Sequence, residues 1–339
     1  MEKEAFSSDS YEFRSLRVSS FSVKFIFRVM WGFYAGRNKV NTLETVNPCE
    51  AVRRPFQEGE PIIVIEPQGQ KHFLTLRSRD KFHHIRMGHI SHDEIIGSPP
   101  GALLTSEKGQ PVVCLRLSFE DYILKRLKRR TSIIHPKDLA SLVLRGDIFP
   151  GASVLEAGIG SGSVTTMLLR LLGKGGRLIS CERRAEFIQP ALENVEEARR
   201  LFGDTGSVHQ VVQGDVYYGI SAANLDMVLL DVPEPDLAAP FAWKALRPGG
   251  ILLSWLPTVN QVYILGRHLQ QFEGWGVVEI RELIQRSWDV AENALRPFHK
   301  MTAHTGFLVR ARKLDIRGYA PKEKSEDQGV KIQDGENDD

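Results

Sequence analysis

The sequence predicts an α/β protein built around a doubly wound, mostly parallel sheet, preceded by a small N-terminal β domain. From Ala152 onward, apolar strand-like runs alternate with helix-length runs, as they do in a parallel sheet with helices on both faces. Between residues 55 and 117, short strand-like runs instead follow one another with only turn-forming residues between them. The two patterns indicate two differently built parts of one chain.

The bulk composition suits a globular protein of ordinary character. The chain has 339 residues, 42% of them hydrophobic and 25% charged, with a net charge of +2. A nucleic-acid surface would therefore have to be a local patch. Cys49, Cys114 and Cys181 share no close spacing, which argues against a CxxC metal knuckle or a disulfide framework and suits a reducing compartment. No apolar run approaches the ~18 residues of a membrane-spanning helix, so we expect no membrane association.

Residues 1–54 form a basic extension that we expect to be poorly ordered. From Phe13 to Leu43 there is no Asp or Glu, while lysines, arginines and aromatic residues are frequent. Such an arm could be an organelle-targeting peptide, a membrane-surface helix, a nucleic-acid-binding arm or a non-essential extension. Transit peptides are poor in acids from their start, whereas this chain begins with Glu2, Glu4, Asp9 and Glu12. The leading acids therefore favour a cytoplasmic location.

The remaining boundaries follow from changes of pattern. Residues 118–150 read as a helical connector, with a second helix from His135-Pro136 through Leu144. Residues 151–314 carry the alternating strands and helices. The expected strands cover 153–158, 177–182, 208–215, 225–231, 251–257 and 306–313, and the expected helices include 163–173 and 185–202. Residues 315–339 form an acidic tail that we expect to be disordered.

A glycine-rich loop follows the first of these strands. Gly158, Gly160 and Gly162 lie where the strand ends and the next helix begins, so the backbone can approach a ligand and present free N–H groups to it. Glu182 stands at the end of the next strand, where a carboxylate can accept hydrogen bonds from both hydroxyls of a ribose. A loop of this kind can also serve packing alone.

The spacing of the glycines separates two cofactor classes. Dinucleotide enzymes favour G-x-G-x-x-G, whereas this loop reads G-x-G-x-G with Glu156 before it, which is typical of S-adenosylmethionine-dependent methyltransferases. Asp215 ends the following strand and is placed to bind the adenine amino group of that cofactor. The candidate cofactor-binding residues are Glu156, Gly158, Gly160, Ser161, Gly162, Ser163, Glu182, Arg183, Asp215 and Val216.

The segment MVLLDVPEPD provides the candidate catalytic residue. Asp231 ends the fourth strand of the expected sheet, and Pro233 and Pro235 stiffen the loop behind it. Ligands of doubly wound sheets bind outside the carboxyl ends of the strands, so Asp231 should face the same crevice as the glycine loop. The alternative is a simple strand-ending turn with a solvated acid.

From roughly Phe56 to Leu314, the sequence resembles the tRNA adenine-N1 methyltransferases that modify the T-loop. The segments that carry the resemblance are GHISHDEIIGSPPG, LRLSFEDYILKRLKRRTSIIHPKD, VLEAGIGSGSVTT, LDVPEPD, LPTVNQV and MTAHTGFLV. The resemblance implies a Rossmann-like class I methyltransferase domain behind a small β domain. It further implies S-adenosylmethionine as methyl donor and N1 of a T-loop adenine, usually at position 58, as acceptor.

The same resemblance implies roles for particular residues. Asp231 matches the target-base aspartate, and Glu182 and Asp215 match the cofactor-binding acids. The family's target-facing aromatic, usually Tyr before PKD, is His135 here, which can still stack on a base; we therefore assign Asp231 and His135 as the catalytic pair. Two further departures are Ile159 in place of a loop threonine and Asp236 in place of a tryptophan that would form one wall of the base pocket.

The partners implied are tRNA and further subunits. Bacterial and archaeal members resemble homotetramers, and the eukaryotic nuclear enzyme pairs with a non-catalytic paralogue. The basic run KRLKRR, Lys125–Arg130, is a candidate tRNA contact, although a solvated helix looks similar. His83, His84 and His89 have no clear metal-ligand spacing, so we expect no metal. Trp288, Arg296 and His299, in another segment typical of the family, are expected to make packing or subunit contacts.

Three other functions remain open at the level of sequence. A methyltransferase for another RNA, a protein or a small molecule would share the glycine loop without needing a basic patch. A non-catalytic tRNA-binding subunit would typically have lost the glycine loop and the target acid, both of which are present here. An NAD-dependent oxidoreductase is disfavoured by the glycine spacing.

Overall fold

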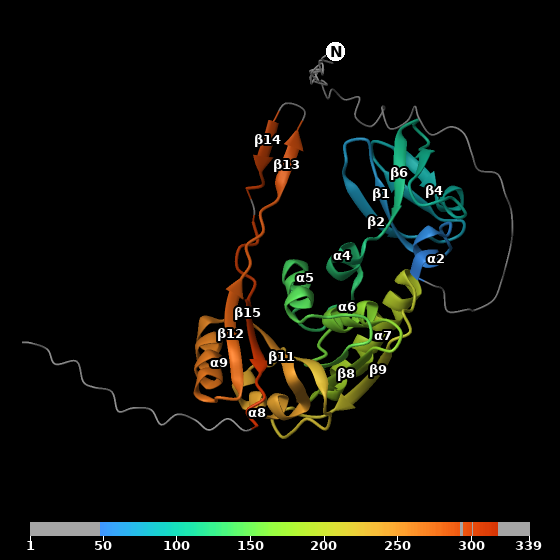
Figure 1. Cartoon of the computed structure of the whole chain (residues 1–339). Coiled ribbons are helices and arrows are strands. Elements are labelled where there is room, and N and C mark those ends of the chain that lie inside the picture. Colours follow the sequence, from blue (N-terminus) through green and yellow to red (C-terminus); the bar gives the residue numbers. More distant parts are fainter. Residues whose placement is uncertain (1–47, 292–293, 300, 318–339) are drawn as a thin grey trace, which may run out of the picture.

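The computed structural model describes residues 48–291, 294–299 and 301–317, and its largest unit is a seven-stranded sheet (Figure 1). The strand order is β12-β15-β11-β10-β7-β8-β9. The bounds of these strands are β7 Ser153–Ala157, β8 Arg177–Glu182, β9 Val208–Gln213, β10 Leu225–Leu230, β11 Leu246–Leu256, β12 Trp275–Glu282 and β15 Phe307–Lys313. The expected doubly wound α/β fold is confirmed.

The direction of the strands places a crevice at the middle of this sheet. β9, β8, β7, β10 and β11 are paired in parallel, whereas β15 runs antiparallel to both of its neighbours, β11 and β12. From β7 the chain first builds the sheet outward through β8 and β9 and then returns to β10 on the other side of β7. Such a reversal of direction leaves a crevice at the carboxyl ends of β7 and β10, where ligands bind in folds of this kind.

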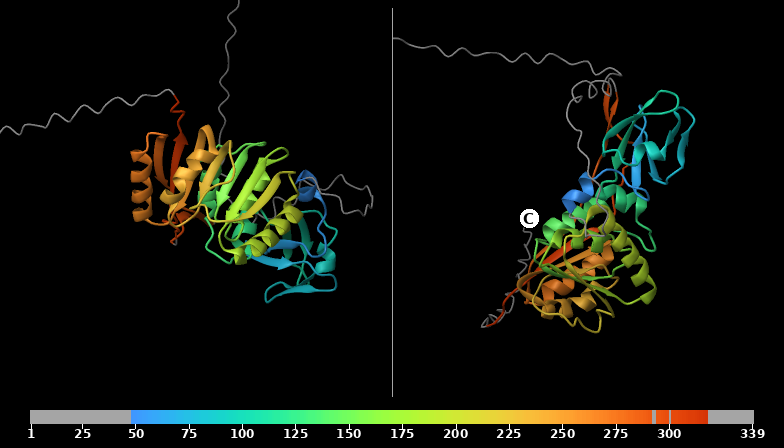
Figure 2. Two further views of the ribbon diagram at one scale, coloured as in Figure 1. Left: turned by 90° about the horizontal axis from the view of Figure 1, so that it is seen from below. Right: turned by 90° about the vertical axis from the view of Figure 1, so that its right-hand side faces the viewer.

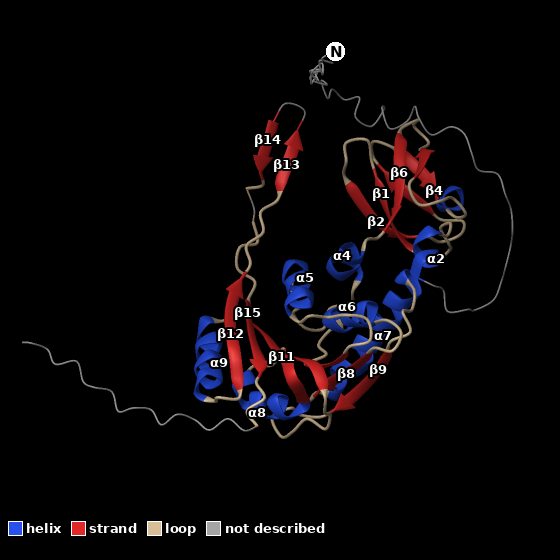
Figure 3. Ribbon diagram, viewed as in Figure 1, coloured by secondary structure: helices blue, strands red, loops and turns tan. Residues whose placement is uncertain are grey.

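Helices cover both faces of the sheet (Figure 3). Those on one face are α5 Pro136–Arg145, α6 Ser163–Leu172 and α7 Ala185–Phe202, and those on the other are α8 Pro235–Ala245 and α9 Val259–Gln271. Neighbouring residues of one strand enter different cores: Val154 belongs to the core that contains Leu168 of α6, and Leu155 to the core that contains Ala242 of α8. Burial on both faces explains why these strands read as continuous apolar runs.

A smaller antiparallel sheet precedes this unit, with strand order β2-β1-β6-β5. Its strands are β1 Pro61–Ile65, β2 Lys71–Thr75, β5 Ala102–Thr105 and β6 Pro111–Arg116, and two short helices, α2 Pro48–Arg53 and α3 His92–Ile95, accompany it. It has its own hydrophobic core, which includes Phe56, Ile62 and Leu76. In the left view of Figure 2, its blue and teal strands lie at the opposite end of the molecule from β12 and β15.

Two hairpins complete the described structure. β3 Lys81–His84 and β4 Gly88–Ser91 pair beside the small sheet, and β13 Trp288–Ala291 and β14 Ala294–Pro297 form an arm that extends beyond the large sheet (Figure 1). The sequence did not predict β3 and β4, because they are only four residues long and rich in lysine and histidine. Trp288 in the arm is 54% exposed, so it is not a core residue of this chain.

The connector between the two sheets differs from a pair of regular helices. α4 Phe119–Asp121 passes directly into a π-helical turn, Tyr122–Arg126, and the chain then continues without regular structure until His135. The basic run Lys125–Arg130 therefore begins at the end of the π-helical turn and continues without regular structure, and it does not surround a helix. The predicted start of α5 is confirmed: His135 is its N-cap and Pro136 its first residue.

Most of the extension predicted over residues 1–54 and of the tail predicted over 315–339 lies outside the described residues. The last part of that extension, expected to be poorly ordered, instead forms the helix α2. Within the described ranges, none of the helices is both long and apolar enough to cross a membrane.

Candidate active site

A cleft with a volume of about 280 Å³ opens where β7 and β10 end. Six of the residues predicted from the sequence line it, namely Gly158, Gly160, Ser161, Ser163, Glu182 and Asp231. The sequence reasoning missed several others that line it, including Thr131, Ser132, Ile134, Arg184, Trp255, Pro257 and Gln261. The glycine loop and the predicted target acid thus line a single cleft.

The glycines of the loop allow close approaches that a side chain would block. Gly158 has φ +90°, and a Cβ atom there would lie 2.5 Å from the backbone oxygen of Asp231. Gly160 has φ +52°, and its Cβ would lie 2.9 Å from Thr131 Oγ1. Because real Cβ contacts are never this short against backbone, Gly158 is required for Asp231 to sit beside the loop.

We expect Gly158→Ala to lower the activity of this site at least tenfold and to lower the melting temperature, because the new methyl group must displace the backbone of Asp231. Gly175→Ala is the matched control: Gly175 also has a positive φ, +86°, but nothing lies within 4 Å of its Cβ position. Each substitution carries about 1–3 kcal/mol of backbone strain, and only the first disturbs the cleft. Equal losses of activity in the two variants, measured alongside thermal melts, would contradict the assignment.

Glu182 lies at the base of the glycine loop. It is only 4% exposed, and its carboxylate accepts hydrogen bonds from the backbone N–H of Arg184 (2.9 Å) and of Gly160 (3.5 Å). The side chain of Arg184 approaches the same carboxylate, with Nε 3.6 Å from Oε1. Glu182 therefore lines the part of the cleft in which the sequence predicts the ribose of the cofactor.

Asp231 begins the loop after β10 and is fixed by its backbone. Its N–H donates to the carbonyl of Ala157 at 2.9 Å, which ties the end of β10 to the end of β7. Burial, together with the nearby carboxylate of Glu182, raises the pKa of Asp231 to about 7. Close to neutral pH, a carboxyl group with this pKa can be either protonated or charged. Groups that act on a substrate often have a pKa shifted in this way.

Glu156, predicted to bind the cofactor, lies beneath the loop and is not among the residues that line the cleft. It is 1% exposed and accepts hydrogen bonds from the hydroxyls of Thr165 (2.6 Å) and Ser180 (2.5 Å). Burial raises its pKa to about 7, against the opposing effect of these hydrogen bonds. In this structure Glu156 joins β7 to α6 and β8 and so supports the loop from behind.

Asp215 and Val216 lie apart from the other predicted cofactor residues, in an adjoining hollow of about 460 Å³. Asp215 accepts a hydrogen bond from the N–H of Tyr217 at 3.0 Å and lies 3.6 Å from Arg183 Nη1. The Tyr217 hydroxyl in turn donates to Glu234 at 2.7 Å, which connects this hollow to the loop of Asp231. The predicted residues that line a hollow are thus divided between two of them, and Glu156, Gly162, Arg183 and His135 line neither.

The aromatic wall of the cleft comes from Trp255 at the end of β11, which the sequence analysis did not single out. A Cβ on Gly306 would lie 2.4 Å from the Trp255 indole, so the absence of a side chain there makes room for the ring. His135, expected to face the target base, is not among the lining residues; its Nδ1 accepts a hydrogen bond from the N–H of Lys137 at 3.3 Å and caps α5. Asp236 lies in the first turn of α8.

The segment before α5 is fixed against the glycine loop. The backbone N–H groups of Arg130 and Thr131 both donate to the Ser161 hydroxyl, at 2.9 and 3.0 Å. Asn194 of α7 donates to the carbonyls of Lys128 and Ser161, at 2.9 Å each. These hydrogen bonds place the basic segment at the mouth of the cleft, an arrangement that the sequence did not reveal because its partners lie far apart in the chain.

A buried network positions the start of α5. Lys137 Nζ lies 2.8 Å from Asp138 Oδ1 and donates to the Leu283 carbonyl and the Thr305 hydroxyl. Thr305 in turn donates to Asp138 Oδ2. Two segments that carried the family resemblance, HPKD and MTAHTGF, therefore meet here, and Lys137, Asp138 and Thr305 act by positioning their neighbours.

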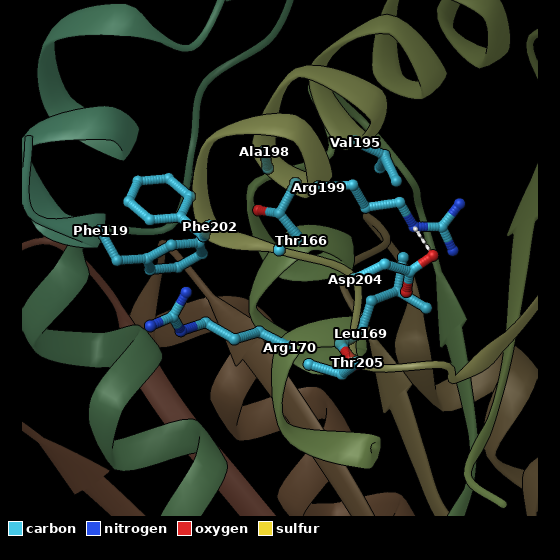
Figure 4. A pocket seen from close by; sticks show the side chains of 11 residues that line it. Phe119, Thr166, Leu169, Arg170, Val195, Ala198, Arg199, Phe202, Asp204 and Thr205 are labelled. Atoms are coloured by element: carbon cyan, nitrogen blue, oxygen red, sulfur yellow. Dashed lines mark hydrogen bonds and ion pairs between the residues drawn. The ribbon is translucent and has the colours of Figure 1, made fainter. Parts of the chain in front are cut away.

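A second recess, between α6 and α7, is not a site of this kind (Figure 4). Its volume of about 20 Å³ is close to that of a single water molecule. Arg170 lies over the rings of Phe119 and Phe202 in this recess, 5.3 Å from each centroid. The recess is therefore too small for a substrate or cofactor and lies beside an edge-to-face pair of rings with Arg170 over both.

The strand order, the single antiparallel strand β15 and a glycine loop with an acid at the end of the next strand together define a class I methyltransferase. The family comparison gives a narrower assignment. Residues 120–296 match the model of the tRNA methyltransferase complex GCD14 subunit, and residues 55–104 match that of the TrmI-like N-terminal region. The chain belongs to this family of tRNA methyltransferases.

Individual relatives agree with that assignment. The tRNA (adenine(58)-N(1))-methyltransferase TrmI of Thermus thermophilus is 30% identical over 253 residues, which are 75% of this chain and 96% of the relative. The crystal structure of tRNA (m1A58) methyltransferase TrmI from Aquifex aeolicus superposes with a TM-score of 0.67 at 27% identity, covering 77% and 99% of the two chains. A structure described as a SAM-dependent O-methyltransferase, from Thermotoga maritima, superposes with a TM-score of 0.69 at 26% identity, covering 77% and 96%.

Proposed function

We propose that this protein transfers a methyl group from S-adenosylmethionine to N1 of a T-loop adenine in tRNA, at position 58. The observation that supports the proposal is the placement of Asp231 directly beside Gly158 of the glycine loop, in a cleft that Trp255 also lines. Membership of the tRNA methyltransferase family, whose models match parts of both sheets, supports tRNA over a protein or small-molecule acceptor.

The residues of the cleft fit the proposed cofactor. Gly158 and Gly160 line the cleft with backbone atoms that a ligand can approach, and Glu182 offers a carboxylate in the same cleft. Asp215 and Val216 in the adjoining hollow would hold the adenine end. When bound, S-adenosylmethionine supplies a methyl group activated by a positively charged sulfur.

The chemistry asked of the protein is mainly positioning. N1 of a neutral adenine carries a lone pair and no proton, so no base is needed to expose the nucleophile. Methylation makes the base cationic, and the Asp231 carboxylate, hydrogen-bonded to the exocyclic amino group, orients the base and stabilises the positive charge that develops. A guanine target would instead require Asp231 to remove the N1 proton as a general base.

Reaching the target also requires opening the tRNA elbow, since a T-loop base must be turned out of its stack at a cost of about a few kcal/mol. Trp255 gives the cleft a flat apolar surface on which an extruded base can stack. The exposed cations at the mouth of the cleft supply phosphate contacts, which fix the register of the RNA without reading its sequence.

The decisive experiment is to incubate the full-length protein with labelled S-adenosylmethionine and unmodified tRNA and to map the methylated nucleoside. We expect 1-methyladenosine at position 58. Absence of label in RNA would overturn the proposal. Label on a guanine would mean that Asp231 acts as a general base. The same assay distinguishes the catalytic protein from a non-catalytic tRNA-binding subunit.

The tRNA contact can be tested at the mouth of the cleft. Within the described residues, Arg126 pairs with Glu197 (2.9 Å) and Lys128 lies 3.8 Å from Glu193, whereas Arg130 is exposed and has no acidic partner. We expect Arg130→Gln to weaken tRNA binding and to lower the slope of log affinity against log salt by about 1. Filter binding at several salt concentrations measures both quantities.

Lys174→Gln is the matched control for Arg130→Gln, since Lys174 is also exposed but precedes β8, at the end of that strand away from the cleft. It should leave the affinity and the salt slope unchanged. If the two variants behaved alike, the basic segment would have no special part in binding tRNA.

The expected homo-oligomer remains a prediction, as does pairing with a non-catalytic paralogue. The β13–β14 arm suits such a contact, because Trp288, Val290 and Leu295 are all more than half exposed there (54%, 80% and 63%). Large apolar side chains gathered on one exposed element commonly mark an interface.

A further inference from the structure

Three potential metal ligands converge in the small β region, far from the methyl-transfer cleft. One ligand atom of each of Glu66, His72 and His84 lies within 4.8 Å of the corresponding atoms of the other two. His84 Nδ1 is 3.6 Å from Glu66 Oε2, and the two imidazole rings are 4.9 Å apart between centroids. We call these three residues the Glu66 cluster.

Strand pairing assembles the cluster from residues whose spacing in the sequence matches no common metal motif. Val64 of β1 pairs with His72 of β2, and Glu66, two residues after Val64, lies on the same face of this antiparallel pair. His84 is the last residue of β3 and reaches the same place from the separate β3–β4 hairpin. The sequence does not predict a metal site here, because the three residues come together only in the tertiary structure.

The cluster contains three buried polar atoms without hydrogen bonds. Within the described residues, Glu66 Oε2, His72 Nε2 and His84 Nδ1 are all buried and have no hydrogen-bond partner. Glu66 itself is only 2% exposed. Unpaired buried polar atoms are rare in folded proteins and costly, so three that face one another indicate a missing shared partner.

We propose that the Glu66 cluster binds a Zn²⁺ ion. Two imidazole nitrogens and one carboxylate oxygen form a ligand set that zinc uses with a water molecule as fourth ligand. Zinc–ligand bonds of about 2.0–2.2 Å at tetrahedral angles bring neighbouring ligand atoms to about 3.4 Å from each other, close to the 3.6 Å that separates His84 Nδ1 and Glu66 Oε2. One ion would satisfy all three unpaired atoms at once.

Arg86 supports this reading of Glu66. Its guanidinium donates to Glu66 Oε1 at 2.8 Å and so directs the other oxygen, Oε2, toward the histidines. Hydrogen bonds of this kind commonly orient metal-binding carboxylates. The competing explanation is an ion pair between a protonated His84 and Glu66, but that pair would leave His72 Nε2 without a partner.

The proposed ion joins two elements that share no sheet. Glu66 and His72 belong to the four-stranded sheet and its turn, whereas His84 belongs to the β3–β4 hairpin. A metal held by both would cross-link them and stabilise the folded β region, because an ion that binds only the folded state raises its stability. The ion would act structurally, away from Asp231.

The test uses the full-length protein, stripped with a chelator, dialysed against Zn²⁺ and analysed for bound metal. We expect one zinc per chain in the wild type and at least tenfold weaker binding in His84→Gln and in Glu66→Gln. His83→Gln is the matched control: His83 is the neighbouring residue of β3, is exposed and faces the opposite side of the strand. Zinc should raise the melting temperature of the wild type and the control, but not of the two cluster variants.

A visible spectrum of the Co²⁺-loaded protein adds a readout that does not depend on stability, since tetrahedral coordination gives strong absorption bands. Wild-type protein that binds no zinc would overturn the proposal. So would zinc bound equally by all variants, because it would then be held elsewhere. Circular dichroism of the metal-free variants checks their folding, and Glu66→Gln serves if His84→Gln fails to fold.

Discussion

Replacing Asp231 with alanine should lower methyl transfer by about 10²–10³-fold or more, the range found when one group that stabilises developing charge is removed. The carboxylate would no longer orient the target base or balance its charge. Because cofactor contacts are assigned to Glu182 and the glycine loop, binding of S-adenosylmethionine should change little. Single-turnover methylation of tRNA and calorimetric cofactor binding measure the two effects separately.

The same residue predicts a pH dependence. Burial raises the pKa of Asp231 to about 7, so the carboxyl group is protonated below that pH and charged above it. If the charged form is required, kcat/KM should fall about tenfold for each pH unit below 7 and level off above it. Glu156 has a similar pKa, raised by burial, and an unchanged profile in Glu156→Gln would exclude Glu156 as the titrating group.

Asp236→Ala is the control for Asp231→Ala, since Asp236 is an acid on the same loop and helix start that does not line the cleft. It should retain activity. A comparable loss of cofactor binding and of methyl transfer in Asp231→Ala would contradict its role at the target base.

The largest loss of stability is expected from Asp138→Ala. Asp138 is 0% exposed, and its removal leaves Lys137 buried with a charge that has lost its carboxylate partner. Breaking one side of a buried ion pair costs about 3–5 kcal/mol. The Thr305 hydroxyl would also lose its acceptor, so the start of α5 and the strand that follows Thr305 would separate more easily.

Denaturant unfolding of the variants measures this loss. Glu196→Ala is the control, because Glu196 forms an exposed ion pair with Arg199 (2.8 Å) on α7, and such surface pairs contribute about 0–1 kcal/mol. A double variant, Lys137→Met with Asp138→Leu, should recover part of the stability by removing both buried charges. A loss below about 1 kcal/mol for Asp138→Ala would mean that water relieves the buried lysine.

Local sequence patterns determined much of the fold and part of the site. The apolar runs that became β7, β8, β10 and β11 are buried on both faces, so their composition alone specified parallel central strands. Gly158 and Asp231 were found because each directly ends such a strand, and carboxyl ends of parallel strands meet at one edge. Both signals lie within a few consecutive residues.

Other features depended on contacts between distant parts of the chain. Trp255, in place of His135, faces the cleft because β11 lies beside β10, and Thr131 joins the glycine loop through Ser161. The Glu66 cluster requires the pairing of β1 with β2 and the docking of a separate hairpin. A residue's neighbours along the chain determine whether it lies in a strand or a turn, whereas the packing of whole elements determines which side chains share a cavity. The sequence therefore determined the sheet, the glycine loop and the target acid. Only the tertiary structure decided which residues form the wall of the cleft and which form the proposed zinc site.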